Sequence, residues 1–157
     1  MNALTLISIG IASLSIFNNN DEAITESNEV KLRKVNHSAF QVGEKLTYKL
    51  HYGVIDAATA VLEVKPTSRS IKGRELYHIV GTGKSISAFD WFFKVRDRYE
   101  TYLDKDGVFP WVFVRRVDEG GYKINQDYTF YQHKNKVNTG KETHSVPDNI
   151  QDMISSF

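Results

Sequence analysis

Apolar and polar residues alternate along two neighbouring stretches in the first half of the chain. In residues 46–52 every second residue is apolar, and the same two-residue period recurs in residues 58–64. This is the period of a β-strand with one buried face. A three-residue loop over residues 54–56 would pair the two strands with Leu50 opposite Ala60. Large side chains then oppose small ones, and the pattern predicts an antiparallel hairpin that leaves space on its inner face.

Turn-forming residues recur at regular intervals after this hairpin. They lie at residues 66–73, 104–107, 120–121 and 133–135. Such spacing is typical of an antiparallel meander. We therefore expect a single all-β domain over residues 40–157, with its sheet curved into a partial or closed barrel. One short helix is expected around residues 86–93, and a second after Asp148, which is a good N-cap residue behind Pro147.

Loop lengths predict which residues face each other in the central strands. A three-residue loop over residues 105–107 pairs Asp97 with Arg115, and a two-residue loop at residues 120–121 pairs Arg115 with Gln126. These three side chains form the one polar row on an otherwise apolar face. An unpaired carboxylate there would lose its solvation, so Asp97 is expected to accept a charge-assisted hydrogen bond from Arg115.

The same face carries aromatic side chains that suit an apolar ligand. In the predicted register Tyr99 faces Phe113, Thr101 faces Trp111, and the next strand adds two more aromatic rings. The polar row would orient a head group while the aromatic residues hold an apolar tail. The alternative is an ion pair that only closes the core of the sheet. The candidate ligand-binding residues are Asp97, Tyr99, Trp111, Phe113, Arg115, Gln126, Tyr128 and Phe130.

The segment SAFDWFF, residues 87–93, concentrates aromatic residues beside the end of a strand. Aromatic clusters usually belong to a core, and these residues then plug the open end of the sheet. The alternative is a mobile gate over a cavity, or an exposed patch that docks a protein or a lipid surface. The candidate gate or docking residues are Phe89, Trp91, Phe92 and Phe93.

The N-terminal residues have the composition of an export segment followed by a linker. Residues 1–17 contain an apolar run of the length of a signal-peptide core, too short to span a bilayer. No Lys or Arg precedes this run, and partial alternation within it leaves an N-terminal strand as the alternative. Residues 18–39 are polar and are expected to form a linker. Lipid anchoring is excluded because the chain has no cysteine to acylate.

Three segments resemble the bacterial family called domain of unknown function 3108. They are FQVGEKLTYKLHYGVIDAATAVLEV at residues 40–64, FDWFFKVRDRYETYLD at residues 89–104 and VPDNIQDMISSF at residues 146–157. The sequence departs from the family at Ala58, where glycine is usual. The resemblance implies an exported protein of the periplasm or cell envelope, without assigned chemistry. It also implies further strands after the last predicted helix, so the chain is expected to be truncated at its C-terminus.

Composition and charge exclude several function classes. The formal net charge is +1, from 20 basic and 19 acidic residues, and it provides no basic patch for a nucleic acid. The absence of cysteine excludes disulfides, thiolate metal ligands and cysteine nucleophiles. The histidines lack the spacing of metal ligands. We therefore expect no metal and no other cofactor.

The segment Gly81-Thr82-Gly83-Lys84-Ser85 is similar to the end of a phosphate-binding loop. That motif requires a glycine five residues before Gly83, where this chain has His78. The segment is expected to be a strand that ends in a glycine turn, and the motif a false match. Since no nucleophile elbow or acid–base pair is found either, we do not expect an enzyme.

These observations predict a non-enzymatic envelope protein that binds a lipid-like or other amphiphilic ligand inside the curved sheet. The alternative is a structural module that docks an envelope protein through a sheet edge or through residues 87–93, without a small-molecule ligand. A third class, an enzyme that acts on an envelope component through a carboxyl of raised pKa at Asp97, stays open. Neither a nucleic-acid partner nor a transmembrane span is expected.

Overall fold

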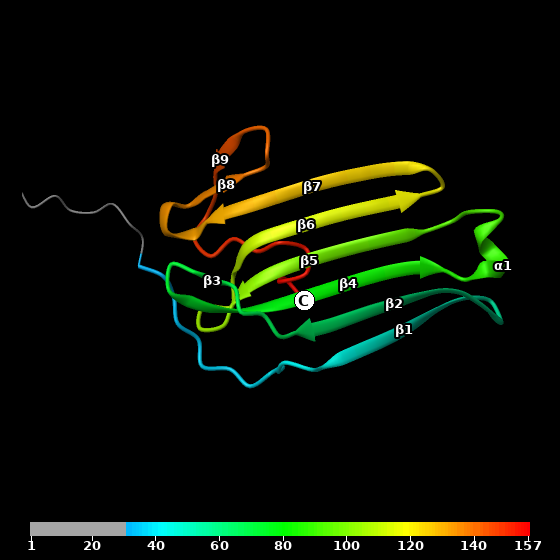
Figure 1. Ribbon diagram of the computed structural model, residues 1–157, viewed down its shortest axis with the longest axis horizontal. Helices are drawn as coiled ribbons and strands as arrows, with labels where there is room; N and C mark the ends of the chain where they lie inside the picture. The colour runs from blue at the N-terminus through cyan, green and yellow to red at the C-terminus, as the bar shows by residue number, and fades with distance from the viewer. Residues whose placement is uncertain (1–30) are drawn as a thin grey trace, which may run out of the picture.

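The computed structural model describes residues 31–157, which form one antiparallel sheet (Figure 1). The strand order is β1-β2-β4-β5-β6-β7-β8-β9, and β3 pairs with β4. β1 and β9 end the sheet, so the expected all-β antiparallel fold is confirmed in an open form. The strands are β1 (Lys45–Tyr52), β2 (Ile55–Lys65), β3 (Ser70–Ile71), β4 (Arg74–Ser85), β5 (Arg96–Asp104), β6 (Pro110–Glu119), β7 (Tyr122–Tyr131), β8 (Lys136–Asn138) and β9 (Thr143–Ser145). The helices are the single turn α1 (Ser87–Asp90) and the 3₁₀-helix η1 (Gln132–Lys134).

The predicted registers of two hairpins are wrong by two residues. Leu50 faces Ala58 rather than Ala60, with an irregularity of the ladder between Leu50 and His51. Tyr99 faces Arg115, with a similar shift after Tyr102. In both hairpins the pair beside the turn already differs from the prediction, Tyr52 with Ile55 and Leu103 with Pro110, and a bulge then shifts the register by one residue. A slip of two residues nevertheless returns each side chain to its own face of the sheet.

The register of the β6–β7 hairpin is confirmed. Glu119 faces Tyr122 across the two-residue turn, and Arg115 faces Gln126. Both turn residues, Gly120 and Gly121, have positive φ angles of 58° and 91°. Glycine adopts such angles more readily than any other residue, and two consecutive glycines are typical of a two-residue hairpin turn, which is why this turn could be recognised from the sequence.

A buried carboxylate joins the strands at the end of the sheet opposite α1. The side chain of Asp104 is fully buried and forms two hydrogen bonds with the guanidinium of Arg74. It also accepts hydrogen bonds from the indole N–H of Trp111 at 2.9 Å and from the backbone N–H of Gly107 at 2.6 Å. Burial alone would raise the pKa of Asp104, but these hydrogen bonds outweigh it and hold the pKa below its ordinary value. Asp104 is therefore an ionised group at the end of β5, beside the β5–β6 loop.

Two apolar clusters lie at this end of the sheet, and one of them contains Trp111, which donates to Asp104. One consists of Val64, Ile79 and Leu103, and the other of Leu76, Phe109 and Trp111. The β5–β6 loop brings the second cluster beside Asp104, because Phe109 and Trp111 come directly after it. The main core thus lies at the end of the sheet away from α1.

Residues 31–40 pack against this core rather than leaving the sheet. The guanidinium of Arg33 donates to the carbonyl oxygens of Gly107 and Val108, and Val35 N–H donates to the carbonyl of Asp106 at 2.7 Å. The packed part of the chain therefore begins before the expected domain start at Phe40. The predicted export segment, residues 1–17, and residues 18–30 of the predicted linker lie outside the described residues.

The C-terminal segment, residues 147–157, packs on one face of the sheet, which we call the inner face (Figure 1). The predicted helix after Asp148 is wrong: a turn over residues 153–156 is present, and Asp152 caps it. One carboxylate oxygen of Asp152 accepts hydrogen bonds from the N–H groups of Ile154 and Ser155, both at 2.8 Å. The other accepts from the hydroxyl of the fully buried Thr101 at 2.8 Å. Burial raises the pKa of Asp152, and these hydrogen bonds oppose the rise without cancelling it.

Replacing Asp104 by alanine is expected to lower the free energy of unfolding by about 3–5 kcal/mol, because the change leaves the charge of Arg74 without its buried partner. Since the folded pKa of Asp104 is lowered, its contribution is complete above about pH 4 and is lost as the pH falls through the folded value. Urea denaturation followed by tryptophan fluorescence measures both effects. The matched control is Asp106→Ala, whose exposed carboxylate lies 4.0 Å from Arg74 and should contribute less than about 1 kcal/mol. Equal losses in the two variants would contradict the role of Asp104.

Replacing Asp152 by asparagine should make stability less dependent on pH. The folded pKa of Asp152 is raised, so the folded protein binds more protons than the unfolded chain, and the free energy of unfolding falls as the pH rises through this interval. Asp152→Asn removes that loss and should gain stability relative to the wild type as the pH rises above about 4. Asp152→Ala also loses the two turn hydrogen bonds, and should be less stable by about 1–2 kcal/mol. If the wild type instead became more stable relative to Asp152→Asn as the pH rises, a raised pKa of Asp152 would be refuted.

Candidate functional site

Small residues occupy adjacent positions of the inner face on two neighbouring strands. β2 contributes Ala58 and Ala60, and β4 contributes Gly83 and Ser85. In the register Ala60 faces Gly83 and Ala58 faces Ser85, so the four residues form a continuous patch. Side chains two residues apart on a strand share a face, and none of these four is large enough to fill the space above the sheet. We call this patch the floor.

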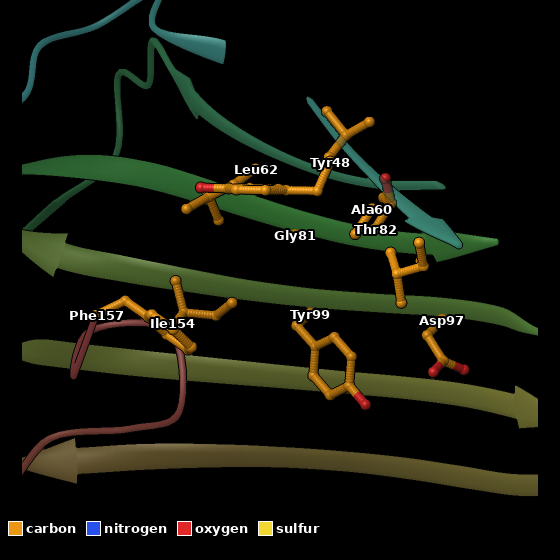
Figure 2. A pocket seen from close by; sticks show the side chains of 12 residues that line it. Tyr48, Ala60, Leu62, Gly81, Thr82, Asp97, Tyr99, Ile154 and Phe157 are labelled. Atoms are coloured by element: carbon orange, nitrogen blue, oxygen red, sulfur yellow. The ribbon is translucent and has the colours of Figure 1, made fainter. Parts of the chain in front are cut away.

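Large side chains border the floor and leave a hollow above it (Figure 2). Tyr48 and Leu50 approach from β1, Tyr99 from β5, and Ile154 and Phe157 from the C-terminal segment. The hollow they line has a volume of about 440 Å³. Its shape follows from the alternation of large residues on β1 and small ones on β2.

A second glycine allows the C-terminal segment to approach the sheet. A β-carbon on Gly81 would lie only 3.1 Å from the δ-carbon of Ile154. Because Gly81 has no side chain, Ile154 rests almost directly on the backbone of β4. This contact and the Asp152–Thr101 hydrogen bond position the segment that borders the hollow.

Two further hollows extend this one along the same strands. Toward the core lies a hollow of about 420 Å³, which shares Tyr48, Leu62, Ile154 and Phe157 with the first. Toward α1 lies a hollow of about 570 Å³. Four of its lining residues each lie two positions along the chain from a residue that lines the first hollow. Since such residues share a face, the three hollows follow one another over the inner face. We call them together the trough. The α1-side positions are Tyr52, Ala58, Ser85 and Val95.

Asp97 is the one charged side chain that lines the central hollow. Its carboxylate accepts a hydrogen bond from the N–H of Asp118 at 3.1 Å. A hydrogen bond with Asp97 and the repulsion between the two carboxylates raise the pKa of Glu119. The central hollow thus has an apolar body and an acidic side.

The predicted ion pair between Asp97 and Arg115 is wrong. Arg115 faces Tyr99 across the ladder, and its guanidinium carbon lies 6.0 Å from the centre of the Tyr99 ring. Within residues 31–157 no ion pair joins Arg115 to Asp97. Gln126 faces Arg115 as predicted, so two members of the polar row are adjacent while Asp97 is displaced along β5. The cause is the β5–β6 pairing: Leu103 faces Pro110 rather than Phe109 beside the loop, and the bulge after Tyr102 adds one more residue of shift, neither of which the sequence pattern reveals.

The structure brings three of the predicted aromatic residues together. The ring of Phe113 lies 6.4 Å from that of Tyr99 and 6.1 Å from that of Tyr128. These rings form a row across β5, β6 and β7. Only Tyr99 lines the central hollow, and Phe113 is buried in the sheet. Tyr128 and Gln126 border a separate hollow near residues 139–141.

Trp111 and Phe130 do not join that row, and the prediction that Trp111 faces Thr101 is wrong. Thr101 faces Phe113, and Trp111 occupies the bulge between the pairs formed by Tyr102 and Leu103. The indole of Trp111 donates to Asp104 and packs against Phe109, so it belongs to the core. Phe130 is buried opposite Val137 of β8.

The candidate gate residues divide into two groups. Phe89 is half-buried and lines the α1-side hollow together with Phe92 and Phe93. Trp91 does not line that hollow, and 84% of its surface is exposed. Exposed fractions of 77% for Phe92 and 49% for Phe93 show that these rings are only partly used for packing.

The sequence prediction did not include the four residues of the floor, nor Tyr48 and Leu50, which border it on β1. The alternation in residues 46–52 and 58–64 did carry their signal, since it set Tyr48 and Leu50 against alanines. Gly81 and Gly83 stood in the apparent phosphate-binding motif, but the structure places them inside β4, which runs on to Ser85. The segment Gly81–Ser85 is therefore strand rather than a loop around a phosphate.

The described residues, 31–157, contain no group of three or more His, Asp or Glu side chains that could hold a metal ion. No helix found in this part of the chain is both long and apolar enough to cross a membrane.

Comparison with known proteins identifies one family. No curated protein and no solved structure matches the chain significantly. Residues 47–157 match the family described as "Protein of unknown function (DUF3108)", and this match includes every strand from β2 to β9 and most of β1. Because the match covers more than half of the sequence, the chain belongs to the DUF3108 family.

Proposed function

We propose that this protein is a non-enzymatic binder of a lipid-like amphiphile, whose apolar tail lies in the trough of the inner face. The observation that carries the proposal is the floor of Ala58, Ala60, Gly83 and Ser85. Protein interiors are normally close-packed, and two more large side chains would fill this space. Small residues at adjoining positions of two strands instead keep the face hollow.

The size and chemistry of the trough suit a single acyl-type tail. Its three hollows measure about 420, 440 and 570 Å³, each within the range of about 300–1,000 Å³ that is usual for small-molecule pockets. Apart from Asp97, the central hollow is lined by uncharged residues, among them Leu50, Leu62 and Ile154. Burying an apolar chain here is favourable because it removes apolar surface of both partners from water.

The acidic side of the hollow restricts the head group. Asp97 and Glu119 lie together, with one cation, Arg115, near Glu119, so a phosphate or carboxylate placed beside Asp97 would meet a net negative charge and be repelled. The hydroxyl of Tyr99 and the carboxylate of Asp97 can instead accept hydrogen bonds from a hydroxyl or an ammonium group. The proposed ligand therefore has an uncharged or cationic head group on this side.

We place this activity in the periplasm or cell envelope as part of the proposal. The support is the apolar run in residues 1–17, which has the length of a signal-peptide core. An exported protein of this kind would meet membrane lipids and their breakdown products, which have the required apolar tails.

The second candidate function is a structural module that docks an envelope protein. One observation favours it: all eight residues of β1 are exposed, and β1 forms an edge of the sheet. A free edge can pair with a strand from another protein through backbone hydrogen bonds. Such docking would use the backbone of β1 and would not depend on the floor.

Replacing Ala60 by leucine is expected to weaken binding of an uncharged monoacylglycerol probe about tenfold or more, because the larger side chain occupies the volume that the tail would fill. Fluorescence titration with a probe labelled in its tail measures the affinity. The matched control is Thr59→Leu, the neighbouring residue on the opposite face of β2, which should bind as the wild type does. Urea denaturation of both variants checks that the fold is retained.

Two outcomes would refute this function. Either the wild type fails to bind the uncharged probe, or Ala60→Leu and Thr59→Leu bind it equally well. A wild type that binds a fatty acid more tightly than the uncharged probe would contradict the assignment of the head group, because the carboxylate should be repelled by Asp97 and Glu119.

A further inference from the structure

Three turns meet at the end of the sheet that carries α1, on the right in Figure 1. They are the β1–β2 turn, the segment of α1 that continues to Lys94, and the β6–β7 turn. The N–H of Ile86 donates to the carbonyl of Ala57 at 3.1 Å, and the N–H of Gly120 donates to the carbonyl of Lys94 at 2.8 Å. The α1 segment is thereby joined to both of its neighbours. We call this end of the molecule the tip.

The α1 segment also packs closely on the β6–β7 turn. A β-carbon on Gly120 would lie 2.6 Å from the ring of Phe93, so this ring covers the turn. The three turns are therefore one connected surface rather than separate loops.

Large apolar side chains protrude from this surface into solvent. Their exposed fractions range from 53% for Ile55 to 98% for Val54. Isolated exposed apolar residues are ordinary, but a cluster at one end of a protein marks an interaction site. The cluster consists of Tyr52, Val54, Ile55, Trp91, Phe92 and Tyr122.

We propose that the tip docks on the surface of a lipid bilayer. Tryptophan, tyrosine and phenylalanine are the side chains that favour the region between lipid head groups and acyl chains. Four of the six, Val54, Ile55, Trp91 and Tyr122, project from the turns outside the hollows of the trough, whereas Tyr52 and Phe92 also line the α1-side hollow. A convex apolar tip can enter a bilayer surface, whereas a protein partner would need a matching cavity.

The position of the trough supports the same partner. The α1-side hollow is lined by Tyr52, Phe92 and Phe93, which belong to the tip or adjoin it. The proposed amphiphile could then pass between bilayer and trough without its tail entering water. The transfer of the amphiphile rests on the proposed function, whereas the exposed cluster does not depend on it.

The charges beside the tip predict the kind of bilayer. Three basic side chains near it already form ion pairs: Lys49 with Asp56, Arg96 with Asp90, and Lys123 with Asp118. Lys94 also lies on the tip, near Asp90, so the basic side chains of the tip are accompanied by carboxylates and do not form a basic patch. Docking should depend on insertion of the apolar side chains, with little need for anionic lipid and weak sensitivity to salt.

The test uses vesicles of phosphatidylcholine and the full chain with the double substitution Trp91→Ser and Phe92→Ser. We expect the affinity for vesicles to fall about tenfold or more, because two large apolar side chains no longer leave water. The matched control is Tyr131→Ser, an exposed aromatic residue at the far end of β7. All chains share residues 1–30, so the difference between variants reports the tip alone.

Fluorescence locates the docking surface independently. Trp91 is exposed and Trp111 is 2% exposed, so only Trp91 should shift its emission to shorter wavelength and be quenched by brominated lipid. Adding about one-fifth phosphatidylglycerol should change the affinity by less than about threefold, which corresponds to a small electrostatic contribution.

The outcomes separate this inference from the proposed function. A wild type that binds the monoacylglycerol probe but not the vesicles would overturn docking and leave the function standing. Vesicle binding that depends on Trp91 and Phe92, without binding of the probe, would support docking and refute the function. Equal vesicle binding by the double variant and the wild type would overturn the tip as the docking surface. Binding only to vesicles rich in anionic lipid would overturn the apolar mode of docking.

Discussion

The buried carboxylate of Asp104 is the interaction on which the rest of this structure depends. It connects Arg74 at the start of β4, the backbone of the β5–β6 loop and the indole of Trp111. A charge removed from water is tolerated only when hydrogen bonds replace its solvation, and here each partner comes from a different part of the sheet. The same loop forms hydrogen bonds with Arg33 and Val35 of residues 31–40, and these contacts stabilise one end of the open sheet.

The other end of the sheet is built in a different way. Toward α1 the inner face carries small residues, and large apolar side chains are exposed on the turns. We infer that the hydrogen bonds of Asp104 supply stability that the small residues of the floor, which leave space unfilled, do not supply. The proposed binding and docking surfaces both lie on the less packed end.

Sequence reasoning was most successful where a local rule decides the structure. The Gly120–Gly121 turn and its register were predictable because two consecutive glycines readily adopt the two positive φ angles of a two-residue hairpin turn. The inner faces of β1 and β2 were predictable because successive side chains of a strand point to opposite faces, so every second residue shares a face. The two bulges were not predictable, because an extra residue in a strand leaves no compositional mark. The β5–β6 bulge, together with the pairing beside its loop, displaced Asp97 from Arg115, and it moved Trp111 from the aromatic row to the core.

The sequence by itself determined the antiparallel all-β class, the separation of apolar and polar faces, and the alternation of large and small residues that makes a hollow. Its alternating pattern depends only on side-chain size and polarity, which each residue carries with it. The tertiary structure decided which hydrogen-bond partners surround Asp104 and Asp152, and where the C-terminal segment lies against Gly81. Those contacts join residues far apart in the chain, and their geometry is set by bulges and by packing that no local pattern encodes.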